Sequence, residues 1–138
     1  LFAALKERKI QVVATDHAPH TRDDKNVEFN QAKFGVIGLE TSLPVMVTKF
    51  VLTKKIDWTR LVELMSTHPA RIMNLEGGSL TPGKSADIVM IDPETEHEVV
   101  PSRFFSKGRN CPFKGWKLKG WPVQTWVAGQ SVFKKEAL

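Results

Sequence analysis

The chain has 138 residues, of which 41% are hydrophobic and 25% are charged, and its formal net charge is +5. This length suits one domain with a moderate core and falls well short of the roughly 250 residues of a complete (β/α)8 barrel. No apolar run approaches the roughly 20 residues of a membrane span, and we find no secretory signal. The single cysteine, Cys111, cannot form an internal disulfide and agrees with a reducing compartment, so we expect a cytoplasmic protein.

Basic residues cluster in the last third of the chain, where no acidic residue occurs between positions 101 and 135. Aromatic residues lie among them, as a binder of single-stranded nucleic acid requires. Gly and Pro interrupt this stretch too often for a continuous stacking surface, so a solvated strand-and-turn surface is the favoured interpretation. A small basic binding module is the alternative, and a salt-dependent nucleic-acid titration would distinguish the two.

The start of the chain predicts a helix end, a buried strand and a long loop. Residues 3–10 are typical of a helix closed by basic residues, and the chain opens inside this pattern, which favours a truncated or processed chain. Residues 11–15 (QVVAT) form an apolar, β-branched run typical of a strand buried on both faces. Pro19 would end any ladder, and the polar, aperiodic residues 21–33 predict a functional or mobile loop.

The middle of the chain predicts three helices. Apolar residues recur at helical spacing over residues 39–54, where Pro44 fits only in the first turn. Asp57 or Thr59 can cap a second helix. A third, short helix would restart within residues 67–76, ending before a pair of glycines.

After Gly78 the pattern becomes that of short strands separated by Gly and Pro. The strand candidates are residues 86–93, 96–100, 116–118 and 125–132. The chain therefore divides near residues 75–79. We expect a strand-and-helix part, residues 1–76, and an all-β part, residues 77–138.

A carboxylate followed by two imidazoles stands directly after the first predicted strand, because residues 15–20 read TDHAPH. At the C-terminal end of a barrel strand a polar residue faces the active site. Asp16 could there bind a cation through oxygen or accept a proton from activated water. An Asp-His pair after a strand is also common as a capping carboxylate and a surface histidine, and spacing alone leaves both interpretations open.

Several longer motifs carry more information than this spacing. They are TDHAPH (15–20), FGVIGLET (34–41), THPA (67–70), GKSADIV (83–89) and NCPFKGW (110–116). Together they resemble dihydroorotases of the bacterial long-chain class, within the amidohydrolase superfamily, and the resemblance extends over essentially the whole chain. It implies an α/β fold: the C-terminal portion of a metal-dependent hydrolase TIM barrel, with its last strand and helices, plus part of a small flanking β-sandwich.

The resemblance implies zinc-dependent, reversible hydrolysis of dihydroorotate to N-carbamoyl-aspartate, a step of pyrimidine biosynthesis. It makes Asp16 a zinc ligand and proton shuttle, His20 the binder of the substrate carboxylate, and Phe34 and Gly35 backbone contacts of the pyrimidine ring. Dihydropyrimidinases, hydantoinases and allantoinases resemble the chain in fold and in the strand-end Asp but lack a His at the place of His20. An imidazole matches the ring carboxylate of dihydroorotate, which favours dihydroorotase.

The family's other zinc ligands and its substrate-binding Arg and Asn residues come from earlier barrel strands, and this chain lacks them. One carboxylate cannot hold zinc tightly, so we expect the 138-residue chain alone to bind zinc poorly and to hydrolyse nothing. His17 is expected to have a supporting or packing role, and His68 a structural one.

The expected partners are the small-molecule substrate and the rest of the dihydroorotase chain, with a homodimer or an aspartate transcarbamoylase complex left open. We expect neither a nucleic acid nor a membrane as partner. One alternative function is a non-catalytic, dihydroorotase-like subunit that supports the transcarbamoylase. Another is a cyclic amidohydrolase of the dihydropyrimidinase or allantoinase type.

Overall fold

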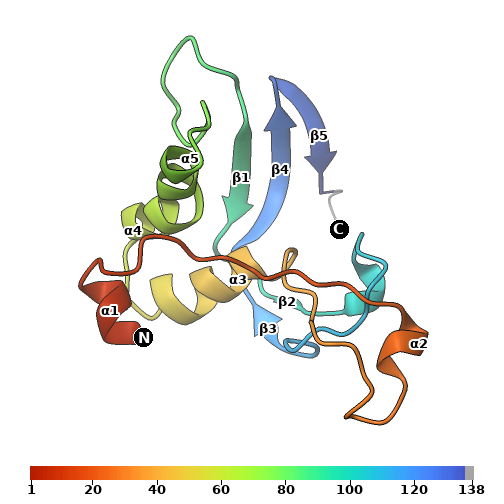
Figure 1. Ribbon diagram of the computed structural model, residues 1–138. Coiled ribbons are helices and arrows are strands. Elements are labelled where there is room, and N and C mark those ends of the chain that lie inside the picture. The colour runs from red at the N-terminus through yellow and green to blue at the C-terminus, as the bar shows by residue number, and fades with distance from the viewer. Residues whose placement is uncertain (136–138) are drawn as a thin grey trace.

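The computed structural model describes residues 1–135 and places the helices in the first half of the chain and the strands in the second (Figure 1). The α-helices are α1 (Phe2–Lys6), α2 (Arg22–Lys25), α3 (Ser42–Met46), α4 (Trp58–Val62) and α5 (His68–Ile72). The strands are β1 (Ile88–Asp92), β2 (His97–Glu98), β3 (Lys117–Leu118), β4 (Trp121–Val127) and β5 (Gln130–Lys134). The expectation of an α/β chain is confirmed at this level.

The predicted strand at residues 11–15 is wrong for this chain, because the segment forms no ladder. It runs extended between α1 and α2 (Figure 1), and beyond it a single parallel bridge joins His17 to Val36. Within the segment the Val13 N–H donates to the Leu64 carbonyl at 3.1 Å, which is a contact with a helix. A strand is stabilised by a neighbouring strand, and residues 1–135 supply none here. The loop predicted at 21–33 contains α2, whose first turn is closed by a Thr21–Asp24 capping box.

The helices form two continuous rods. In the first, α3 continues into a wide π-type turn, η1 (Val47–Val51), and Pro44 lies in the first turn of α3 as predicted. This rod starts at Ser42, so Leu39 lies outside the apolar stripe assigned to it and is 62% exposed.

The second rod begins at Asp57, whose side chain accepts the Arg60 N–H at 2.7 Å, and this confirms one of the two predicted caps. It runs through α4, the π-type turn η2 (Glu63–Thr67) and α5 without interruption, so the predicted restart near residue 67 is wrong. The wide turn ends at Thr67, two residues before Pro69, which lacks an N–H and crowds the preceding turn.

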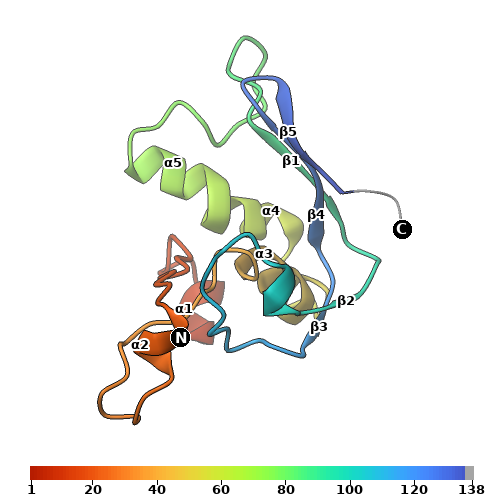
Figure 2. The same cartoon turned by 90° about the vertical axis from the view of Figure 1, so that its right-hand side faces the viewer.

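Strands β1, β4 and β5 form an antiparallel sheet in the order β1-β4-β5, and β2 pairs with β3. The single strand predicted at 125–132 is wrong, because the chain reverses there between β4 and β5. Ala128 and Gly129 both have positive φ, 49° and 79°, as a two-residue hairpin turn requires. The two helical rods lie on one side of this sheet (Figure 2).

Two apolar clusters hold the chain together. The first joins α1 to the helical rods, with Val47 and Leu64 fully buried, and Ile91 of β1 packs against it. The second joins Ile37 to Val99 and Leu118 in the second half of the chain. The outer end of β1 lies outside both clusters.

The loop between β3 and β4 joins the strands to the first rod. The Lys119 N–H donates to the Thr48 hydroxyl at 2.8 Å, and that hydroxyl donates to the Lys119 carbonyl at 3.1 Å. Among residues 1–135, no helix is long and apolar enough to cross a membrane.

Candidate functional site

Asp16 ends the extended segment, and its backbone turns sharply there. Its φ of 45° lies in the left-handed region, which Asp tolerates better than most residues. The side chain is exposed and makes no hydrogen bond or ion pair within residues 1–135. Both carboxylate oxygens are therefore free to bind a cation or to exchange a proton.

His17, the residue after Asp16, hydrogen-bonds to the backbone of the segment at Gly38. Its Nδ1 accepts the N–H groups of Gly38 and Leu39, each at 3.2 Å. Because Nδ1 accepts, a neutral imidazole carries its proton on Nε2. This contact fixes the neighbour of Asp16 to the segment that contains Phe34 and Gly35. His68 likewise contacts backbone, with its Nδ1 3.1 Å from the Gln11 carbonyl oxygen.

The three residues expected to bind substrate lie together. The His20 Nε2 lies 2.6 Å from the Phe34 carbonyl oxygen and donates to it. Gly35 has a φ of 123°, and a Cβ on it would lie 2.6 Å from the Cβ of Ala18. Only glycine fits here without a shift of the backbone. Phe34 is 97% exposed, so this aromatic residue does not pack in a core of the chain.

Two further residues reach the same backbone, and the sequence analysis assigned no role to either. The Lys25 ammonium donates to the Lys33 carbonyl at 2.5 Å and to the Gly35 carbonyl at 3.1 Å. The Asn110 side-chain amide donates to the same Gly35 carbonyl at 3.2 Å. Because Asn110 lies 75 residues from Gly35 in the sequence, no spacing rule could have connected them.

Comparison with known proteins places this arrangement in a family. The model of the Amidohydrolase family matches residues 2–132. The chain belongs to the amidohydrolase family. It is 44% identical over 135 residues to a dihydroorotase of Geobacillus sp. (strain WCH70), covering 98% of this chain and 32% of that protein. A dihydroorotase of Brevibacillus brevis is 46% identical over 134 residues, covering 97% of this chain and 32% of the relative.

Solved amidohydrolase structures share the fold. An L-hydantoinase (dihydropyrimidinase) from Arthrobacter aurescens superposes with a TM-score of 0.91 at 33% identity, over 99% of this chain and 32% of that one. A D-hydantoinase from a Bacillus sp. AR9 superposes with a TM-score of 0.89 at 26% identity, over 96% of this chain and 30% of that one. The chain thus spans about a third of the length of the relatives it matches.

A cationic hollow of this amidohydrolase chain adjoins the candidate site. It has a volume of about 230 Å³ and is bounded by residues from the start of α2 and from the loop before Cys111. Its lining residues are His20, Thr21, Arg22, Lys25, Lys107, Arg109 and Asn110. The hollow contains four Lys or Arg side chains and no acidic one, so its potential favours an anion.

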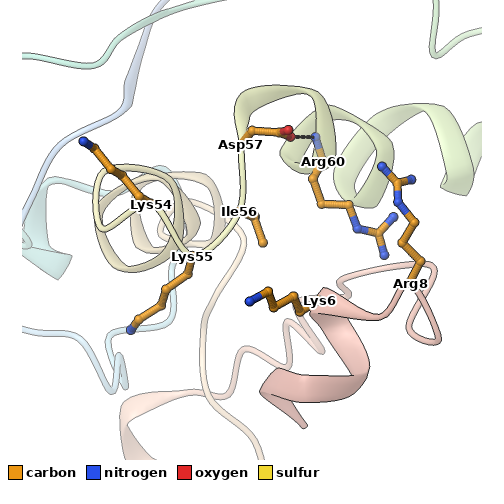
Figure 3. A pocket seen from close by; sticks show the side chains of 7 residues that line it. All are labelled: Lys6, Arg8, Lys54, Lys55, Ile56, Asp57 and Arg60. Carbon is orange, nitrogen blue, oxygen red and sulfur yellow. Dashed lines mark hydrogen bonds between the residues drawn. The ribbon is translucent and has the colours of Figure 1, made fainter.

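A second hollow, of about 330 Å³, lies where the end of α1 meets the start of α4 (Figure 3). None of the expected site residues lines it. Arg60 crosses this junction almost fully buried, donating to the Ile10 carbonyl at 2.6 Å and to Glu63 at 3.0 Å. The hydrogen bond from Arg8, followed by that from Arg60, lowers the pKa of Glu63 below its usual value. These contacts join the end of α1 to the second helical rod, so their role is structural.

Metal binding needs more than this amidohydrolase chain provides. Among residues 1–135, no three His, Cys, Asp or Glu side chains are grouped so that they could hold a metal ion. The free carboxylate of Asp16 fits the role of one oxygen ligand, which hard and borderline cations accept. Three or four protein ligands are the norm for zinc, so further ligands would have to come from outside these residues.

Proposed function

We propose that this chain is the C-terminal part of a dihydroorotase, which opens the cyclic amide of dihydroorotate to N-carbamoyl-aspartate and closes it in the reverse direction. The observation that carries the proposal is the grouping of His20, Phe34 and Gly35 in a chain that is 42–46% identical to proteins named dihydroorotase. The hydantoinase structures support the fold, and an identity of 33% to one of them and 26% to another makes a hydantoinase-type activity the second candidate.

The architecture we infer for the parent protein explains the unpaired segment before Asp16. Residues 11–15 would pair as the last strand of a (β/α)8 barrel once its neighbours are supplied by the remaining two thirds of the protein. Residues 1–76 would belong to the barrel and residues 77–138 to a flanking β-sandwich. Asp16 would then stand at the C-terminal end of a barrel strand, the face on which these barrels carry their active sites.

In this arrangement zinc would be held by Asp16 together with ligands from outside the chain. When bound, the metal polarises the ring carbonyl and activates water. Asp16 would accept the proton released as water adds to the carbonyl carbon. It would return that proton to the ring nitrogen as the C–N bond breaks, so the ring opens without net proton release at this step.

The substrate would be held by the neighbouring residues. Because the Nε2 of His20 already donates to the Phe34 carbonyl, its Nδ1 is the nitrogen left for the substrate carboxylate, and it donates in the imidazolium form. The backbone of Phe34 and Gly35 would contact the pyrimidine ring. The proposed partners are the substrate and the rest of the dihydroorotase chain, in a cytoplasmic enzyme that could form a homodimer or join an aspartate transcarbamoylase.

The test is Asp16→Asn in the full-length parent protein, assayed for dihydroorotate hydrolysis with zinc present. We expect a loss of about 10²–10⁴-fold in kcat, the range for a removed general acid–base group. Asn tolerates the left-handed backbone at this position, so folding should persist. The matched control is Asp23→Asn, the same change on an exposed residue of α2, which should leave kcat unchanged.

Three results would contradict the proposal. Full activity of Asp16→Asn would show that Asp16 is not the proton shuttle. An unsubstituted parent that neither binds zinc nor turns over dihydroorotate would favour the non-catalytic subunit, and turnover of hydantoins instead would favour the second candidate. The isolated 138-residue chain serves as a negative control, because it should bind zinc poorly and show no hydrolysis.

A further inference from the structure

We propose that Asn110 is a positioning residue of the substrate site, which it completes from the second half of the chain by fixing the backbone after Gly35. The inference rests on the proposed function, because it concerns the backbone that would hold the substrate ring. It adds a residue from outside the part of the chain that carries Asp16 and His20.

Asn110 contacts this backbone at two points. Its side-chain amide donates to the Gly35 carbonyl at 3.2 Å, and its own carbonyl accepts the Ile37 N–H at 2.9 Å. The Gly35 carbonyl also accepts from Lys25, and the Phe34 carbonyl accepts from His20. Both carbonyls of this turn are thus held by side chains from separate segments.

Holding a carbonyl also fixes the N–H of the same peptide group. The peptide unit is planar and trans, so its N–H points away from its C=O. His20 therefore fixes the direction of the Gly35 N–H, whereas Lys25 and Asn110 together fix the direction of the Val36 N–H. The Gly35 N–H has no hydrogen-bond partner within residues 1–135, so it is the free donor that this backbone can offer to a ring carbonyl. The Val36 N–H belongs to the parallel bridge between His17 and Val36, in which the Val36 carbonyl accepts the Ala18 N–H at 3.0 Å. Lys25 and Asn110 thus hold the peptide group that links the free donor to the segment of Asp16.

The loop that carries Asn110 is anchored independently of this contact. The Glu40 carboxylate accepts the N–H groups of Phe105 and Ser106, each at 3.0 Å. Gly108 is buried, and a Cβ on it would lie 2.8 Å from Ile37 and 3.1 Å from Pro19. Removing the Asn110 amide should therefore leave the loop in place and take away one of the two donors, Asn110 and Lys25, that hold the Gly35 carbonyl.

The experiment measures the kinetics of Asn110→Asp and Asn110→Ala in the full-length parent protein. Asn110→Asp keeps the shape but replaces the donor amide with a carboxylate that repels the Gly35 carbonyl. We expect KM for dihydroorotate to rise about tenfold, the effect of one lost hydrogen bond of roughly 1.4 kcal/mol, while kcat changes by less than about threefold. A ring contact made in both ground and transition state acts on KM in this way.

The matched control is Asn74→Asp, the same chemical change on an exposed residue after α5, which should leave KM unchanged. The thermal unfolding of Asn110→Asp should match that of the control. Unchanged KM in both Asn110 variants would overturn the inference, and so would a fall in kcat together with the unfolding temperature, because that indicates a purely structural contact. If the unsubstituted parent does not turn over dihydroorotate, the proposed function fails first and this inference with it.

Discussion

At the scale of single residues, several polar side chains hold backbone groups that no helix or strand satisfies. His17, Glu40 and Asn110 each bond to backbone N–H or C=O groups in loops. Buried or partly buried backbone groups need partners, and a chain with long irregular segments must find them in side chains. The polar residues around the candidate site thus serve largely to hydrogen-bond to the backbone of loops.

Asp92 is one such residue, and its ionisation makes stability depend on pH. At the end of β1 its carboxylate bonds to Thr95 and to the N–H of Glu94, and these contacts lower its pKa from 3.8 to about 2. A carboxyl group whose pKa is lower in the folded than in the unfolded protein stabilises the fold at pH values above its unfolded-state pKa. This stabilisation is lost as the pH falls through the folded-state pKa. We expect this contribution to disappear between pH 3.8 and about 2.

The measurement is urea unfolding over that pH range for the unsubstituted protein and for Asp92→Asn. The acid-induced fall in the free energy of unfolding should be shallower in Asp92→Asn, because the group that takes up the proton is gone. Glu98→Gln, which removes an exposed carboxylate of β2, provides the control. Identical acid slopes for the unsubstituted protein and Asp92→Asn would refute the assignment.

At the scale of elements, the contact between the first helical rod and the β3–β4 loop depends on Gly120. This glycine has a φ of 85°, and a Cβ on it would lie 2.4 Å from the Cβ of the fully buried Val47. Gly83 has nearly the same φ, 88°, but an added Cβ would meet nothing within 4 Å. The two positions thus separate the cost of backbone strain from the cost of overpacking.

We expect Gly83→Ala to lower the free energy of unfolding by about 1–2 kcal/mol, the cost of a left-handed non-glycine residue. Gly120→Ala should lower it further, by about 1–3 kcal/mol, because the methyl group must displace Val47 or the loop. Denaturant unfolding of the two variants gives the difference directly. Equal losses would mean that the rod and the loop do not touch as described.

At the scale of the whole molecule, the chain itself covers the first helical rod, because Met46, Val47 and Val51 are buried. Three consecutive apolar residues of β1, by contrast, are exposed: Ile88 at 37%, Val89 at 51% and Met90 at 49%. Successive side chains point to opposite faces, so both faces of this edge strand are uncovered.

We therefore expect the isolated chain to self-associate in dilute solution through the edge strand β1, because unpaired apolar edges favour pairing with another chain. Sedimentation velocity should show mass increasing with concentration. Val89→Lys should shift the distribution toward the monomer, whereas Leu80→Lys, in the exposed loop before β1, should not. A monomer at all concentrations for the unsubstituted chain would contradict this expectation.

The sequence alone determined the features that depend on near neighbours. The local preferences of one or a few residues predicted the position of Pro44 in a first turn and the presence of short strands after Gly78. They also predicted a helix cap at Asp57 or Thr59, and the structure uses Asp57. The motifs also identified the family, which the match over residues 2–132 confirms. The roles of Asp16, His20, Phe34 and Gly35 stay predictions.

Tertiary structure decided everything that depends on a partner distant in sequence. Residues 11–15 have the composition of a strand but remain unpaired, because a ladder needs a second strand that composition cannot supply. The chain reverses at Ala128-Gly129, which divides the strand predicted at 125–132, and β4 pairs with β5 across this turn. Asn110 joins the candidate site only because the folded chain brings its amide to Gly35, a contact that no local preference encodes.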